Sequence, residues 1–318
     1  MSSTIKPAKT DILSAALRIR PHIHRTPVLT SENLSNLLGC TLYFKCENMQ
    51  KAGAFKSRGA CNAVFSLDDE SAKRGVATHS SGNHAAALAR AAALRGIDAH
   101  IVMPSNSSKV KIAAVQSYGG KITYCEPNLA SRESTVAKVI ADTGAVEIHP
   151  YNDLRIIAGQ ATAALEMIED HPDLYIILSP IGGGGLLSGT ALSAFYFSEN
   201  AKVIATEPEQ ANDAYQSFQQ KKFVPSVNPN TIADGLRTSL GSFTFPIILE
   251  HVSDIVTVTE AEIAVAMRLV WERMKIIIEP SSAVPVAALL AKKVDVMGKN
   301  VGIILSGGNV DLDELPWN

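Results

Sequence analysis

The chain alternates between short apolar runs and longer stretches whose apolar residues recur at helical spacing. Such runs are typical of buried strands, and such spacing is typical of amphipathic helices. We expect strands at residues 41–45, 76–78, 99–103, 121–124, 145–149, 174–178, 202–206, 254–258 and 301–305. We expect the main helices at residues 11–23, 60–65, 85–94, 109–117, 133–142, 155–169, 186–197, 260–275 and 282–292. This alternation predicts an α/β protein with parallel sheet and helices on both faces.

Two helices follow residues that suit an N-cap. Thr10 precedes the first helix and Thr259 precedes the helix over residues 260–275. A threonine hydroxyl can accept a hydrogen bond from the backbone of the first turn, so we expect both helices to begin there. A polar stretch over residues 210–242 interrupts the alternation.

The pattern predicts two α/β units. Strands and helices follow one another most closely over residues 75–150, which we expect to form a small domain. Residues 1–74 and 151–318 should form one larger domain, so that the smaller is inserted in the larger. A chain of 318 residues is long enough for both.

Composition and charge exclude several classes of protein. A hydrophobic content of 46% and a charged content of 19% are ordinary for a folded globular protein. The net charge of −2 and the lack of a dense basic run argue against a nucleic-acid partner. The apolar runs are too short to span a membrane, and the first residues lack a signal-peptide core, so we expect a cytoplasmic protein. The four cysteines lack metal-site spacing and are expected to be buried free thiols.

A glycine-rich stretch predicts an anion site. Gly182, Gly183, Gly184 and Gly185 lie between an expected strand and an expected helix. Glycines allow backbone N–H groups to converge on a phosphate at a helix N-terminus. The dinucleotide and Walker A patterns do not fit the residues that follow the glycines, so the carrier of the phosphate stays open. A tight turn without a ligand is the alternative.

Four unusually polar or glycine-rich loops follow expected strands. They lie around Lys56, at residues 79–84, at residues 182–185 and at residues 306–309. Ligands of open α/β sheets bind beyond the carboxyl ends of the strands, so we expect these loops to meet at one site.

These loops carry a family resemblance. Residues 53–59 (Gly-Ala-Phe-Lys-Ser-Arg-Gly), 80–84 (Ser-Ser-Gly-Asn-His), the four glycines and residues 306–309 (Ser-Gly-Gly-Asn) occur in order along nearly the whole chain. The set resembles the pyridoxal 5′-phosphate (PLP) enzymes of fold type II, which are tryptophan synthase β-like, and more closely the serine racemase and serine/threonine dehydratase branch. The resemblance implies that the phosphate belongs to PLP.

The resemblance also implies roles at the cofactor. Lys56 would bond the cofactor aldehyde and later act as a base, which requires a lowered amine pKa. Phe55 would lie against the cofactor ring, Asn83 would bind its 3-oxygen, and Ser306 would face its nitrogen. A neutral serine does not enforce a protonated ring, and this favours elimination and racemisation over transamination.

The substrate residues implied by the resemblance lie mainly in the second loop. Ser80, Ser81, Gly82, Asn83 and His84 precede a helix, and their N–H groups and hydroxyls suit an α-carboxylate. Ser81 would be the acid/base on the face opposite Lys56, and two opposed bases permit racemisation. An N-cap serine is the alternative.

A divalent cation is implied as well. Glu207, the Ala211 carbonyl and Asp213 resemble the family's cation ligands, and an oxygen shell of this kind suits Mg²⁺ or Ca²⁺. Two solvated surface carboxylates are the alternative.

We therefore expect racemisation, β-elimination or both on a small 3-hydroxy amino acid, with serine as the leading substrate, in a homodimer. Arg132 and Arg237 could instead bind the second carboxylate of 3-hydroxyaspartate. Threonine dehydration, β-replacement and a PLP carrier without turnover also stay open. Tyr151 stands where mammalian-type racemases have Asn, and Ala85 replaces the glycine that usually follows the histidine.

Overall fold

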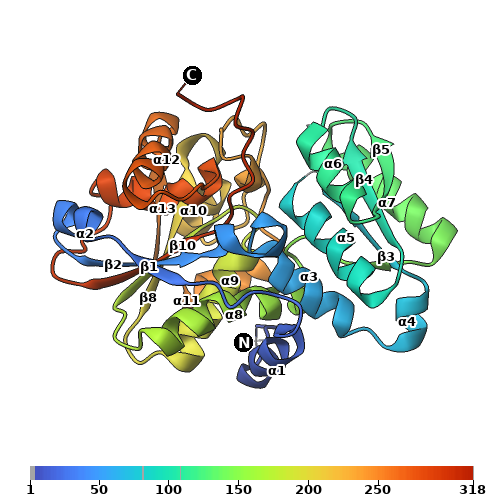
Figure 1. The fold of residues 1–318 in the computed structure, drawn as a ribbon, viewed down its shortest axis with the longest axis horizontal. Coiled ribbons are helices and arrows are strands. Elements are labelled where there is room, and N and C mark those ends of the chain that lie inside the picture. Colours follow the sequence, from blue (N-terminus) through green and yellow to red (C-terminus); the bar gives the residue numbers. More distant parts are fainter. Residues whose placement is uncertain (1–3, 81, 108, 318) are drawn as a thin grey trace.

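A computed structural model describes residues 4–80, 82–107 and 109–317. Its larger sheet has six strands, of which only the first runs antiparallel to its neighbour (Figure 1). In spatial order the strands are β1 (Val28–Thr30), β2 (Thr41–Cys46), β10 (Asn300–Leu305), β7 (Ile176–Pro180), β8 (Lys202–Pro208) and β9 (Asp254–Val258). The last strand in the chain therefore lies in the interior of the sheet.

The smaller sheet has four parallel strands that are consecutive in the chain. Their spatial order is β5 (Lys121–Cys125), β4 (Ala99–Pro104), β3 (Val76–His79) and β6 (Val146–Glu147). Strands of the larger sheet both precede and follow this block, which confirms the α/β class and the insertion. The exact domain boundaries stay a prediction.

Helices cover both faces of the larger sheet (Figure 1). One face packs against α12 (Glu260–Met274) and α13 (Pro280–Leu290), and the other against α8 (Leu154–Asp170) and α9 (Gly185–Phe197). Ile303 lies in the first core and its neighbour Ile304 in the second, because successive side chains of a strand point to opposite faces.

The remaining helices are shorter or surround the smaller sheet. They are α1 (Lys9–Ile19), α2 (Glu32–Leu38), α3 (Lys56–Phe65), α4 (Asp69–Lys73), α5 (Asn83–Arg95), α6 (Lys109–Ser117), α7 (Leu129–Thr143), α10 (Asp213–Gln220) and α11 (Thr244–His251), with 3₁₀ turns η1 (Glu47–Met49), η2 (Lys51–Gly53), η3 (Glu209–Ala211) and η4 (Asp234–Leu236). In Figure 1, α3 lies between the two sheets, and it packs against both α5 and α8.

One predicted cap is wrong and the other is confirmed. The first helix begins at Lys9, and its N-cap is Ala8, whose N–H donates to the Asp11 carboxylate at 2.8 Å. Because the Asp11 carboxylate accepts the N–H of the N-cap residue, the helix begins before Thr10, which lies inside the first turn. The helix ends at Ile19 rather than at residue 23. Thr259 does cap α12.

The structure also bears on membrane-spanning helices and on the cysteines. None of the helices in the described ranges combines the length and the apolar character that a membrane crossing requires. All four cysteines are buried and free, as expected.

Candidate active site

Three of the four polar loops are joined directly by backbone and amide contacts. Ala54 and Gly307 form an antiparallel bridge, and the Phe55 N–H donates to the Ser306 carbonyl at 3.0 Å. The Asn309 amide donates to the Asn83 side-chain oxygen at 2.9 Å. The loop before α3, the start of α5 and the loop after β10 therefore meet at one place.

Lys56 is the first residue of α3, and its amine lies where these loops meet. The amine donates to the Pro150 carbonyl at 2.8 Å and lies 5.1 Å from the centre of the Phe55 ring. Burial lowers the pKa of Lys56 to about 8, although the Glu279 carboxylate opposes this shift. The Lys56 amine therefore loses its proton far more readily near neutral pH than an ordinary lysine, and its neutral form can accept a proton.

The glycine loop connects β7 to α9 and leaves backbone donors free. None of the N–H groups of residues 182–185 donates a hydrogen bond to any residue that the structure describes. Gly184 has a φ of +87°, which favours glycine, and the Tyr151 ring packs so closely on Gly183 that a Cβ there would lie 2.4 Å from it. The carbonyl of Pro150, the residue before Tyr151, accepts a hydrogen bond from the Lys56 amine. Residues 150 and 151 therefore connect the glycine loop with the loop around Lys56.

Ser306 is buried at the end of β10. Its hydroxyl lies 3.1 Å from the Ser282 hydroxyl, which also donates to the Gly307 carbonyl at 2.6 Å. The side chain that Ser306 contacts is thus neutral.

Glu279 is a site residue that the sequence reasoning missed. It is 4% exposed, and both of its oxygens accept hydrogen bonds from the Asn83 side chain. Burial, and next the Asp234 carboxylate, raise the pKa of Glu279 to about 7. The available signal was an acid placed directly after the apolar residues 276–278 and before Pro280.

The loop between β3 and α5 places polar groups at a helix start. The Gly82 N–H lies 3.4 Å from the Ser80 hydroxyl, while Ser81 lies outside the described residues. His84 is buried with Nε2 3.2 Å from the Ile148 carbonyl, and burial lowers its pKa well below the usual value. His84 is therefore neutral at physiological pH.

The two arginines considered for a second carboxylate differ in their contacts. Arg237 is exposed, and its guanidinium donates to the Thr231 carbonyl. Arg132 is partly buried, and its Nε has no hydrogen-bond partner among the described residues. Burial lowers the pKa of His79, and the positive charge of Arg132 also lowers it. Arg132 therefore lies near His79, the last residue of β3.

Tyr151 belongs to an aromatic group beside Lys56. Its ring centre lies 4.6 Å from that of His149, which in turn lies 5.8 Å from that of His79. Nδ1 of His149 accepts the Asn152 N–H at 2.9 Å, and burial lowers the pKa of His149 to about 4. Two neutral histidines and a phenol therefore line this side of the site.

The residues considered for a cation include a buried carboxylate pair. Glu207 accepts hydrogen bonds from the Ala214 and Tyr215 N–H groups at 2.9 and 2.7 Å, at the start of α10. Asp213 is 5% exposed, and neither of its oxygens has a hydrogen-bond partner in the described ranges. Burial raises the pKa of Asp213 to about 6, and burial together with Asp213 raises that of Glu207.

The donor chemistry of this pair fits a divalent cation, because an orphaned buried carboxylate needs a compensating charge. No group of three or more histidine, cysteine, aspartate or glutamate side chains suited to a metal occurs among the described residues. A cation would therefore be held by two carboxylates completed by carbonyl and water oxygens.

The place where the loops meet offers what a phosphorylated aldehyde needs. Free N–H donors precede a helix N-terminus. The Lys56 amine, whose pKa is lowered, contacts the Pro150 carbonyl, one residue before the Tyr151 ring that packs on Gly183. The residues present therefore fit PLP.

Comparison with known proteins gives the same class. Residues 19–307 match the family model of the pyridoxal-phosphate dependent enzymes. The chain is 53% identical over 312 residues to a beta-hydroxyaspartate dehydratase of Paracoccus denitrificans (strain Pd 1222), with 98% of this chain and 99% of that protein covered. It is 52% identical over 316 residues to a serine racemase of Arabidopsis thaliana, with 97% and 95% covered.

A solved structure has the same fold over nearly its whole length. The crystal structure of serine racemase from Dictyostelium discoideum matches with a TM-score of 0.91 at 50% identity, with 95% of this chain and 98% of that chain covered. The fold and the site thus define an α/β enzyme of fold type II. The chain belongs to the family of pyridoxal-phosphate dependent enzymes, and its cofactor is PLP.

Proposed function

We propose that this enzyme racemises a small 3-hydroxy amino acid, eliminates its β-hydroxyl, or does both, with serine as the leading substrate. The products are the opposite enantiomer, or a 2-keto acid and ammonia. The observation that carries the proposal is the Lys56 amine, whose pKa of about 8 suits it to take a proton from the substrate α-carbon.

Bound PLP supplies an aldehyde and an electron-withdrawing ring that stabilise the charge left at the α-carbon. The protein residues would then bind and orient the reactants. Lys56 would hold the cofactor and move the α-proton, and Phe55 would lie against the ring. The free N–H groups of Gly182, Gly183, Gly184 and Gly185 would bind the phosphate. The neutral hydroxyl of Ser306 would leave the ring nitrogen uncharged, which favours elimination and racemisation.

The start of α5 would bind the substrate α-carboxylate. Ser80, Ser81, Gly82 and Asn83 offer N–H groups and hydroxyls there, and neutral His84 adds no charge. A proton delivered by Ser81 to the face opposite Lys56 would give the other enantiomer, whereas loss of the β-hydroxyl first would give the keto acid.

A specific observation favours 3-hydroxyaspartate as a second candidate substrate. The buried Nε of Arg132 has no partner among the described residues, and an arginine can bind a carboxylate bidentately. The relative from Paracoccus denitrificans is named for this activity. Arg237 would not share the role while it binds the Thr231 carbonyl.

We further propose that Glu207, the Ala211 carbonyl and Asp213 bind Mg²⁺ or Ca²⁺. We also infer a cytoplasmic homodimer whose small domain spans residues 75–150. Light scattering during size-exclusion chromatography measures the mass, and a monomer at micromolar concentration would contradict the dimer.

One substrate panel tests the function. L-serine, D-serine, L-threonine and 3-hydroxyaspartate are each incubated with the holoenzyme, and keto acid, ammonia and both enantiomers are measured. We expect turnover of serine by elimination or racemisation. A faster reaction with 3-hydroxyaspartate would establish the second candidate. Spectral binding of all four without any product would leave a PLP carrier.

A further inference from the structure

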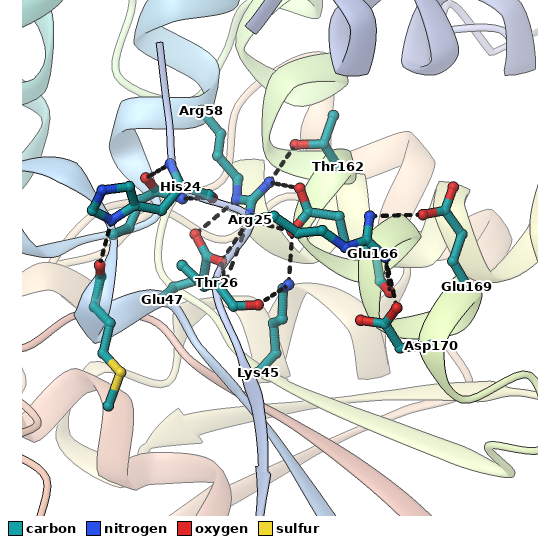
Figure 2. A network of polar contacts seen from close by, with 12 residues as sticks. His24, Arg25, Thr26, Lys45, Glu47, Arg58, Thr162, Glu166, Glu169 and Asp170 are labelled. Atoms are coloured by element: carbon teal, nitrogen blue, oxygen red, sulfur yellow. Dashed lines mark hydrogen bonds and ion pairs between the residues drawn. The ribbon is translucent and has the colours of Figure 1, made fainter. Parts of the chain in front are cut away.

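Four charged side chains form a buried cluster beside the first turn of α3 (Figure 2). The side chains of Lys45, Glu47 and Arg58 are 0% exposed, and that of Glu166 is 13% exposed. The two positive and two negative charges balance. Of the four, only Arg58 belongs to a site motif, that of residues 53–59.

Arg58 is the centre of this cluster, and both of its long edges bind carboxylates. Nε and Nη2 donate to the two oxygens of Glu47 at 2.7 and 2.8 Å. Nη1 and Nη2 donate to the two oxygens of Glu166 at 2.8 Å each. Nη1 also donates to the Thr162 hydroxyl at 3.1 Å. A guanidinium held in two bidentate pairs has one fixed position and orientation.

Lys45 completes the cluster. Its amine donates to Glu166 and to the Thr26 carbonyl, each at 2.7 Å. Each carboxylate therefore has at least one cationic partner. A buried ion cluster of this kind is often no more stabilising than well-packed apolar residues of the same volume. Stability alone thus gives a weak reason for its presence.

The position of the cluster relative to Lys56 gives a stronger reason. Arg58 follows Lys56 by two positions at the start of α3. Residues two positions apart in a helix are rotated by about 200° around its axis. The lysine and the arginine therefore lie on opposite sides of the first turn. Lys56 contacts the Pro150 carbonyl at the site, and Arg58 is fixed to η1 and α8 on the other side.

Helix α8 connects the cluster with the acceptor of the lysine amine. Besides Glu166, α8 provides Gln160, whose oxygen accepts the Gly59 N–H at 3.2 Å, and Gly159, where a Cβ would lie 2.6 Å from the Gly59 Cα. The chain enters α8 a few residues after Pro150, whose carbonyl accepts the Lys56 amine at 2.8 Å. The packing of α3 on α8 therefore fixes both partners of that hydrogen bond.

We propose that Arg58, together with Lys45, Glu47 and Glu166, positions Lys56 by fixing the first turn of α3 against α8. Arg58 is a positioning residue, because its guanidinium is held by Glu47 and Glu166 and acts on the site only through the first turn of α3. The inference rests on the proposed role of Lys56 as the residue that bonds PLP.

A charge-balanced double variant separates positioning from stability. Arg58→Met alone leaves a buried excess of negative charge and should lower Tm by about 10 °C. Adding Glu47→Gln leaves Lys45 paired with Glu166, so the double variant should recover most of that loss while the tether of α3 stays broken. Arg25→Met is the matched control, because Arg25 forms exposed ion pairs with Glu169 and Asp170 of the same helix (Figure 2).

Three measurements on the full chain report the position of Lys56. They are the dissociation constant of PLP, the pH dependence of Lys56 acylation after PLP removal, and the pH profile of kcat/KM for the holoenzyme. In the double variant we expect at least about tenfold weaker PLP binding and a Lys56 titration moved toward ordinary lysine values. We expect a loss in kcat/KM of roughly 100-fold at pH 7.5 that becomes smaller as the pH rises. Arg25→Met should leave all three unchanged.

Native PLP affinity and a native Lys56 titration in a folded double variant would overturn the inference. If neither variant folds, Thr162→Val decides, since it removes one acceptor of Arg58 and keeps all four charges. It should shift the same measurements by about two- to threefold, and native values would again overturn the inference. Mass spectrometry of the native holoenzyme after borohydride reduction tests the underlying role separately. PLP at another lysine would refute the proposed role of Lys56, whatever the variants show.

Discussion

Nδ2 of Asn83 donates to both carboxylate oxygens of Glu279, at 2.9 and 3.1 Å, although the two residues are 196 positions apart. The oxygen of the same Asn83 amide accepts from Asn309. The amide is therefore held in one orientation, and its contacts couple the start of α5 to the segment before α13. The ionisation of Glu279 should consequently influence both the site and the stability of the fold.

Replacing Glu279 by glutamine should change how stability depends on pH. The folded-state pKa of about 7 lies above the usual 4.5, so the folded state holds the extra proton between these values. Stability from this group is fully present below pH 4.5 and is lost as the pH rises through 7, by roughly 3 kcal/mol. Urea unfolding at several pH values should show a shallower decline in Glu279→Gln. Parallel curves for the two proteins would contradict this assignment.

Lys56→Ala should abolish covalent attachment of PLP and all turnover, because it removes the amine that lies between the Pro150 carbonyl and the Phe55 ring. Its circular dichroism spectrum should match that of the native protein. Borohydride reduction followed by peptide mapping measures the attachment. A PLP adduct that still forms at this site in the variant would refute the assignment.

Ser81→Ala tests the acid/base on the opposite face. If Ser81 delivers the proton there, the variant should lose racemisation and D-serine elimination by about 100-fold or more, while L-serine elimination changes little. Chiral chromatography and keto-acid assays measure the three rates. An equal decrease in all of them would make Ser81 a ligand of the α-carboxylate instead.

Cation removal should destabilise the protein in a pH-dependent way. The pKa of Asp213 is raised from 3.8 to about 6. Without a cation, ionisation of this group therefore lowers the free energy of unfolding as the pH rises between these two values, by about 3 kcal/mol at neutral pH. Saturating Mg²⁺ or Ca²⁺ should restore the stability, and chelation should lower Tm and activity together. Asp213→Asn should remove the response. If chelation changes neither quantity in the native enzyme, the cation site is wrong.

Arg132→Ala should act selectively on a substrate with two carboxylates. A desolvated, charge-assisted pair contributes about 1.5 to 3 kcal/mol, so kcat/KM for 3-hydroxyaspartate should decrease about ten- to 100-fold, and that for serine much less. Arg237→Ala is the matched control, since the Thr231 carbonyl binds that guanidinium. Equal losses for both substrates in Arg132→Ala would assign this arginine to general folding or to the shared α-carboxylate.

The alternation of strands and helices could be predicted because buried strands and amphipathic helices have distinct apolar periods. The start of α3 could not. We expected that helix from residue 60, but it begins at Lys56, because Ser57 and Arg58 are polar residues buried in its first turn. Hydrophobic periodicity does not identify a buried arginine whose two carboxylate partners lie in other elements. Helix α10 was missed for a similar reason, since its residues are mostly polar.

Local motifs predicted that the site loops meet, but they could not predict contacts that depend on tertiary pairing. The loops around Lys56 and Ser306 were expected to meet, and they do, through the bridge between Ala54 and Gly307. Glu279 was missed, because a single acid after an apolar run has no motif of its own. Its role depends on Asn83, which approaches only after the smaller sheet has been placed.

The place of β10 in the sheet constrains how the chain can fold during synthesis. Residues 300–305 insert between β2 and β7, pairing Asn300 with Thr41 and Val301 with Ile176. All four strands of the smaller sheet precede residue 148, so that sheet can be complete while β2 still has an open edge. The nascent protein therefore carries an open edge on β2 until residues 300–305 have been made, a period in which that edge can join another chain.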